Sequence, residues 1–177
     1  NIRYTGHLNG EIPSNINVLS SLESIHLSDN ELNGSIPSEI GNLSNLKSIS
    51  FSWTSLSGII PEQIGNLNDL LFLNIGDSYI SGGIPSSLSN LTNLISLDLE
   101  SNDLSGSIPE EIFDLVNLEF LRLDNNQFSG IIHENICSLN IDWTGNSNIS
   151  NNLFCPPYPD CLTEEDIGYQ NTSECEE

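Results

Sequence analysis

A phrase of 24 residues recurs along this chain of 177 residues and constrains its fold more than any other feature. Residues 32–46 read LNGSIPSEIGNLSNL, and residues 56–70 read LSGIIPEQIGNLNDL. Successive repeats begin at Leu22, Leu46, Leu70, Leu94 and Leu118. No single helix or hairpin has this spacing of apolar residues over its whole length, whereas one coil of a solenoid does. The repeat therefore predicts a stack of coils, each burying its apolar side chains against its neighbours.

The apolar positions are the same in every repeat, and in the first repeat they are Leu22, Ile25, Leu27, Leu32, Ile36, Ile40 and Leu43. We expect a short strand at the start of each repeat and a turn fixed by the Ile-Pro pair. The ninth position is polar throughout: Asn30, Thr54, Ser78, Asn102 and Asn126. An inward asparagine can bridge backbone groups of neighbouring coils, so we expect a ladder that weakens at Thr54 and Ser78.

The consensus L-x-x-L-x-L-x-x-N-x-L-x-G-x-I-P-x-x-I-G-x-L resembles the plant-type leucine-rich repeat, from about Leu8 to Asn140. It is similar to the ectodomains of plant receptor-like kinases, to polygalacturonase-inhibiting proteins and to a related plant antifreeze protein. The resemblance implies a right-handed solenoid of the α/β type, mostly strand and coil, with a parallel sheet on its concave face. We expect repeats in residues 1–140, the first truncated, and a disulfide-bonded C-terminal cap in residues 141–177.

The four cysteines, Cys137, Cys155, Cys161 and Cys175, all lie near one end of the chain. Their even count suggests disulfides and an oxidising compartment, and their spacing alone leaves three pairings open. The stretch NNLFCPPYPDC resembles the family's C-terminal cap, which implies Cys155–Cys161 and Cys137–Cys175. An extracellular or cell-surface location is therefore expected, with five candidate glycosylation sites at Asn33, Asn42, Asn90, Asn148 and Asn171.

The composition is strongly acidic, with 25 acidic residues against 3 basic ones and a net charge of −22. Such a surface repels nucleic acid, so we expect no nucleic-acid partner. No apolar run approaches the roughly 18 residues needed to cross a bilayer, so no membrane span is expected in this chain. The opening residues NIRYTGHLNGEIP lack the family's usual cysteine-bearing cap. The chain is interpreted as a trimmed product whose N-terminal end is bare or covered by another molecule.

Catalytic patterns are sparse. His7, His26 and His133 fall at different positions of different repeats, and His133 with Cys137 would supply too few ligands for a structural zinc site. There is no Gly-x-Ser-x-Gly motif, phosphate loop or dinucleotide fingerprint. We therefore expect neither an enzyme nor a cofactor.

The outward positions of the concave sheet are the best place for a binding site. Aromatic anchors there would carry binding energy beyond their number. The candidate ligand-binding residues are Trp53, Phe72, Asp77, Asp98, Glu100, Phe120, Arg122 and Asp124. Asp98 and Arg122 should pair across adjacent coils. Glu100 and Asp124 should face each other as like charges, which makes them a weak calcium candidate, and the alternative is a pair of solvated acids that point apart.

These observations favour a secreted module that recognises a protein, peptide or glycan on its concave face. The alternative is a structural subunit that assembles by stacking through its uncapped N-terminal end. Ice binding is a third hypothesis, suggested by the antifreeze resemblance. The regular column that motivates it is Asn33, Ser57, Ser81, Ser105 and Ser129. Its neighbours vary and threonine is scarce, so this hypothesis ranks last.

Overall fold

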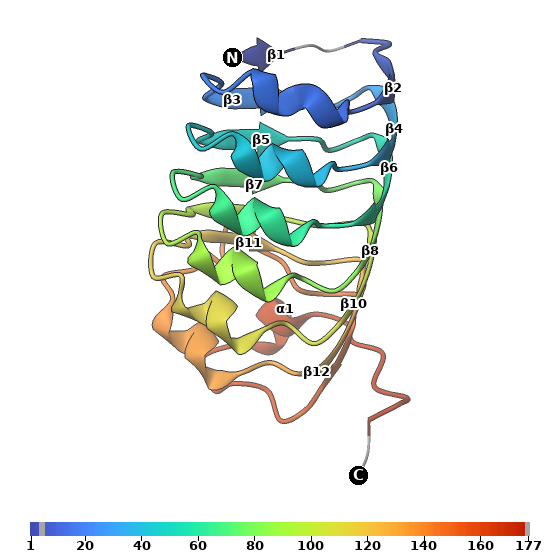
Figure 1. Ribbon diagram of the computed structural model, residues 1–177. Helices are drawn as coiled ribbons and strands as arrows, with labels where there is room; N and C mark the ends of the chain where they lie inside the picture. The colour runs from blue at the N-terminus through green and yellow to red at the C-terminus, as the bar shows by residue number, and fades with distance from the viewer. Residues whose placement is uncertain (4–5, 176–177) are drawn as a thin grey trace.

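The computed structural model describes residues 1–3 and 6–175. The chain winds into a stack of coils that runs from the N-terminus to the C-terminus (Figure 1). Each regular coil passes through one strand of a first sheet, one strand of a second sheet and one short 3-10 helix. Within the described part of the chain, no helix is long and apolar enough to cross a membrane. The predicted solenoid is confirmed.

The first sheet contains six parallel strands in the order β1-β3-β5-β7-β9-β11. They are β1 (Ile2–Arg3), β3 (Ser24–His26), β5 (Ser48–Ser50), β7 (Phe72–Asn74), β9 (Ser96–Asp98) and β11 (Phe120–Arg122). The strands pair in the predicted register, with Ile49 opposite Leu73 and Leu121 opposite Leu97. These middle residues are buried, so the residues on either side of them face away from the core.

A second parallel sheet of seven strands, which the sequence analysis did not anticipate, lies along another side of the stack. All of its strands except the last are labelled down one edge of Figure 1. They are β2 (Asn9–Glu11), β4 (Glu31–Ser35), β6 (Ser55–Ile59), β8 (Tyr79–Gly82), β10 (Asp103–Gly106), β12 (Gln127–Ile131) and β13 (Leu153–Cys155). The five strands β4, β6, β8, β10 and β12 each contain a repeat glycine with positive φ, such as Gly58 at 80°, a conformation costly for other residues.

Short 3-10 helices close the coils. They are η1 (Ser14–Val18), η2 (Ser38–Asn42), η3 (Glu62–Asn66), η4 (Ser86–Asn90), η5 (Glu110–Asp114) and η6 (Glu134–Ser138). The residue before each helix is the proline of the Ile-Pro pair, except before η6, where it is His133. Among the described residues the only α-helix is α1 (Glu164–Ile167), which agrees with the expected scarcity of α-helix.

The polar ninth position forms the predicted ladder inside the stack. Asn102 accepts a hydrogen bond from Ile80 N at 2.9 Å and donates to carbonyls of its own coil and of the preceding one. Thr54 and Ser78 instead bond to each other, Oγ1 to Oγ at 3.0 Å, so the ladder is weaker there as expected. Asn152 adds a further rung, which the sequence analysis missed because it lies outside the regular spacing.

The predicted disulfide pairing is wrong. The bonds are Cys137–Cys161 and Cys155–Cys175, each with a Cα–Cα distance of 5.6 Å. Cys155 ends β13 in the second sheet, whereas Cys137 lies in η6 on the helical side, and the segment after Cys155 returns to that side. The tail then comes back to the last coil, where Asn171 N donates to Asn152 O at 2.9 Å, and this brings Cys175 to Cys155. Coil stacking also continues past residue 140, where the cap was expected to begin.

Candidate functional site

The outward face of the first sheet carries aligned rows of polar side chains. In the fifth position of successive coils lie Arg3, His26, Ser50, Asn74, Asp98 and Arg122, each opposite the next. Hydrogen bonds link neighbours on this face, including His26 Nε2 with Ser48 Oγ at 2.8 Å and Asn74 Nδ2 to Asp98 Oδ2 at 3.2 Å. The strands thus present one continuous polar surface whose charged residues gather toward the C-terminal half.

Three carboxylates gather around Arg122. Its guanidinium forms a hydrogen-bonded ion pair with Glu100 through Nη2. Nη1 lies 3.8 Å from Asp98 Oδ2, so the expected pairing of these two residues is confirmed. Nε lies 3.8 Å from Asp124 Oδ1. Because long side chains reach diagonal neighbours across a sheet, Arg122 contacts the acids of both columns.

Arg122 supplies the positive charge that the calcium hypothesis assigned to an ion between Glu100 and Asp124. Within residues 1–3 and 6–175, no group of three or more histidine, cysteine, aspartate or glutamate side chains is placed to hold a metal ion. The three carboxylates Asp98, Glu100 and Asp124, together with Arg122 at their centre, are called the acidic cluster below.

Burial raises the pKa values of two carboxyl groups in the acidic cluster. Burial raises the pKa of Asp98 to about 6, Arg122 opposes the rise, and the charges of Asp124 and Asp77 add to it. Burial likewise raises the pKa of Asp124, which is only 3% exposed. Asp124 Oδ1 and Arg122 Nε are both buried without a hydrogen-bond partner. One guanidinium therefore does not fully satisfy the carboxylates around it.

The candidate aromatic residues do not form one patch. Trp53 is 66% exposed and lies in the turn after β5, whereas Phe72, 44% exposed, begins β7 at the other end of the strands. Phe120 is only half-exposed at the start of β11. Trp53 and Asp77 occupy the eighth position of consecutive coils, so Trp53 lies on the same side of the face as the acidic cluster.

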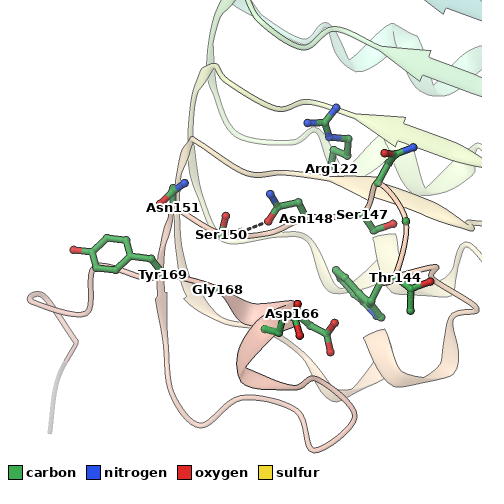
Figure 2. A pocket seen from close by; sticks show the side chains of 13 residues that line it. Arg122, Thr144, Ser147, Asn148, Ser150, Asn151, Asp166, Gly168 and Tyr169 are labelled. Carbon is green, nitrogen blue, oxygen red and sulfur yellow. Dashed lines mark hydrogen bonds between the residues drawn. The ribbon is translucent and has the colours of Figure 1, made fainter.

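A hollow of about 730 Å³ lies at the C-terminal end of this face. Figure 2 shows Arg122, Asn148 and Ser150 on one side of it and Asp166 of α1 on the other. Its remaining wall includes Trp143 and Tyr169. The sequence analysis named Arg122 as a ligand-binding candidate and Asn148 only as a glycosylation candidate, and it missed the other lining residues because they lie beyond the last regular repeat.

Four of the five glycosylation candidates are exposed: Asn33, Asn42, Asn90 and Asn171. Asn148 differs, because it is half-buried in the hollow and its Oδ1 accepts a hydrogen bond from Ser150 N at 3.0 Å.

The fold and the repeats define the class of this protein. The sequence profile of the leucine-rich repeat family matches residues 73–128, and a single-repeat profile of the same family matches residues 21–43 and 45–67. The chain belongs to the leucine-rich repeat family. A search of curated protein sequences gave no match.

Solved structures of plant proteins share this fold. The ectodomain of the Arabidopsis thaliana receptor kinase GASSHO1/SCHENGEN3, in complex with CASPARIAN STRIP INTEGRITY FACTOR 2, is 39% identical with a TM-score of 0.80, over 84% of this chain and 18% of that one. The Arabidopsis receptor kinase HAESA, in complex with the peptide hormone IDA and a co-receptor, is 37% identical with a TM-score of 0.81, over 85% of this chain and 25% of that one. A plant ice-binding protein is 32% identical with a TM-score of 0.78, over 86% and 49%. The chain thus spans a quarter or less of the two receptor ectodomains.

Proposed function

We propose that this chain is an extracellular recognition module that binds a peptide, or an extended segment of a protein, on the outward face of the first sheet. The observation that carries the proposal is the gathering of charged side chains around Arg122 on this face, beside a hollow of about 730 Å³ and with the exposed Trp53 and Phe72 at the two ends of the strands. Two of the similar structures are receptor ectodomains solved with a partner, a peptide hormone in the case of HAESA. Two disulfides fit an oxidising location.

A peptide suits this face better than a glycan. The hydroxyl, amide and carboxylate groups form rows that run across the strands from coil to coil, so an extended chain crossing the coils meets one polar group after another. Trp53 and Phe72 stand at opposite ends of the strands, so they do not supply the adjacent aromatic faces on which successive sugar rings would stack.

Peptide display tests the proposal. Peptides selected on the wild type should bind Phe72→Ser at least ten-fold more weakly, because aromatic anchors dominate interface energies. Serine is compatible with the fold there, since Ser48 and Ser96 hold the same position in the adjacent coils. The control is Tyr79→Ser on the second sheet, an aromatic residue that is more exposed than Phe72, at 61%, and whose counterpart one coil earlier is Ser55. Selected peptides that lose affinity for Tyr79→Ser instead, or for neither variant, would contradict the proposal.

Assembly through the N-terminal end is the second candidate. An apolar hollow of about 330 Å³ lies there, and its lining includes Ile2, Leu8, Val18 and Leu19. Exposed apolar groups in such a place favour association. In sedimentation experiments, association would appear as a molecular mass that rises with protein concentration, and Val18→Asp should return the mass to that of a monomer. A wild type that stays monomeric at every concentration would exclude this assembly.

A further inference from the structure

We infer that the outward face of the first sheet holds a subsite for a positively charged side chain of the ligand, an arginine or a lysine. The subsite lies between the indole of Trp53 and the carboxylates of Asp77, Asp98 and Glu100. This inference rests on the proposed function, because it names the chemistry of the peptide bound at the same face.

The residues of the subsite come from three consecutive coils. Trp53 N donates to Gly76 O at 3.2 Å, and Asp77 N donates to Glu100 O at 2.9 Å. Adjacent coils are about 4.8 Å apart, so an arginine or lysine side chain lying over the middle coil would be about one coil spacing from the coil of the indole and from that of Asp98 and Glu100.

Gly76 opens the space between these coils. Its φ is not in the left-handed region, so the backbone there does not require glycine. A Cβ at Gly76 would lie 3.0 Å from Glu100 Cγ and 3.2 Å from Asp98 Oδ1. The equivalent residues of the two preceding coils, Ser28 and Ser52, have side chains. The glycine therefore leaves room for both acidic side chains over the backbone of the coil that carries Asp77.

The negative charge here is not balanced within the protein. Asp98, Glu100 and Asp124 share a single arginine, Arg122, and the charge of Asp77 also acts on Asp98. Among the described residues, the Asp77 carboxylate accepts no hydrogen bond and forms no ion pair. A ligand cation would bring the missing positive charge, and the exposed indole face of Trp53 adds a cation–π contact.

An unsatisfied buried pair beside the subsite also points to a second cation. Asp124, 3% exposed, directs Oδ1 at Arg122 Nε across 3.8 Å, too far for a hydrogen bond, and neither atom has another partner. Arg122 is divided among three carboxylates. When a ligand cation binds Asp98 and Glu100, Arg122 can move onto Asp124 and satisfy both atoms.

Binding is therefore linked to pH. Burial holds the pKa of Asp98 at about 6, with Arg122 opposing and Asp124 and Asp77 reinforcing the rise. A bound cation favours the carboxylate and lowers this pKa. The complex consequently releases protons near pH 6, and affinity falls as the pH is lowered through 6.

Calorimetric titration with synthetic peptides tests the inference. The probe is an acetylated and amidated nonapeptide of glycine and serine carrying two arginines, and its control carries the neutral isostere citrulline in their place. We expect the arginine peptide to bind the wild type at pH 7.5 about ten-fold more tightly than the citrulline peptide. Its affinity should fall between pH 7 and 5, with proton release near pH 6 shown by the dependence of the heat on the buffer.

Two variants locate the effect. The double variant Asp98→Asn with Glu100→Gln should lose the preference for arginine and the pH dependence. The matched control, Glu62→Gln with Glu111→Gln, removes the same charge from exposed positions on η3 and η5 and should keep both. Trp53→Asn, which leaves every carboxylate in place, should weaken the arginine peptide and spare the pH dependence.

Equal binding of the two peptides, equal losses in the double variant and its control, or a flat pH profile of the wild type would overturn the inference. If display-selected peptides still depend on Phe72 in that case, the proposed function stands and only the cationic subsite falls. If selected peptides ignore Phe72 as well, the proposed function falls with it.

Discussion

Replacing Asn126 by alanine is expected to lower the free energy of unfolding by about 3 kcal/mol. The side chain is buried and joins two coils. Its Oδ1 accepts a hydrogen bond from Leu104 N at 3.0 Å. Its Nδ2 faces the carbonyls of Leu99, Leu123 and Asp124 at 2.9, 3.2 and 3.2 Å. The two amide hydrogens are shared among the three carbonyls and count as two full hydrogen bonds. With the bond that Oδ1 accepts, three full hydrogen bonds are lost, each worth about 1 kcal/mol net.

The weak part of the ladder supplies the comparison. Ser78 Oγ lies 3.0 Å from Thr54 Oγ1 and 3.4 Å from Gly76 O, so only the first contact counts as a good hydrogen bond. Ser78→Ala should therefore cost about 1 kcal/mol. Both substitutions remove a buried polar side chain at the same position of the repeat. The difference of about 2 kcal/mol consequently measures what the asparagine adds by bridging backbone groups.

Urea unfolding followed by circular dichroism and by tryptophan fluorescence measures both free energies. Repeat proteins can unfold in parts, so the two signals must coincide before the values are compared. If Asn126→Ala costs no more than Ser78→Ala, the bridging hydrogen bonds do not stabilise the stack as argued. Ser78→Asn provides the reverse test, since a gain in stability is expected when a full rung is restored.

Three further outcomes are expected. Lowering the pH from 7 to 5 should raise the unfolding free energy of the wild type more than that of Asp98→Asn. Burial raises the folded-state pKa of Asp98 from 3.8 to about 6, so the folded state binds a proton at a higher pH than the unfolded state does. Parallel pH profiles of the two proteins would contradict this. Cys155→Ser combined with Cys175→Ser should cost about 2–4 kcal/mol in urea, while non-reducing peptide mapping of the wild type should recover Cys137 linked to Cys161. Trp53→Asn should have an unfolding free energy about 1 kcal/mol higher than Trp53→Ala, and so a higher melting temperature, because asparagine tolerates the positive φ of 56° at that residue. Equal melting temperatures of the two variants would show that the backbone there is not strained.

The sequence was sufficient to predict the first sheet, the core and the asparagine ladder because one spacing determines all three. A residue at a given position of one repeat lies opposite the same position of the next, as Ile49 and Leu73 do. The pairing of Asp98 with Arg122 was predictable for the same reason. The contacts of Arg122 with Glu100 and Asp124 were not, because they join different columns, the first diagonally to the preceding coil and the second within the same coil, and depend on the direction of a long flexible side chain.

The second sheet and the cap lay beyond sequence reasoning for different reasons. Strands such as β6 and β12 each contain a glycine with positive φ, and glycine is usually unfavourable in a strand, so their sequences resemble turns. The cap has no repeat, and its disulfides depend on where the tail comes back to the last coil. That path depends on long-range contacts such as Asn171 N to Asn152 O, which no local pattern reveals.

The departures from local rules on this solenoid occur together. The eighth position has positive φ in every coil, and the residues there other than Trp53 are Asp29, Asp77, Ser101, Asn125 and Asn151, small polar residues that tolerate it better. Trp53 is the exception, and it is largely exposed, so packing does not require the tryptophan. In the next coil Gly76 replaces a serine, and beyond it three carboxylates contact one arginine. Each of these residues lowers the stability of the fold. Other coils of the same chain have a less costly residue at the same position, such as a small polar residue in place of Trp53 or a serine in place of Gly76. Natural sequences keep such conflicts where binding needs them, so their concentration in four consecutive coils is an argument, independent of the similar structures, for the proposal that this part of the first sheet contacts a ligand.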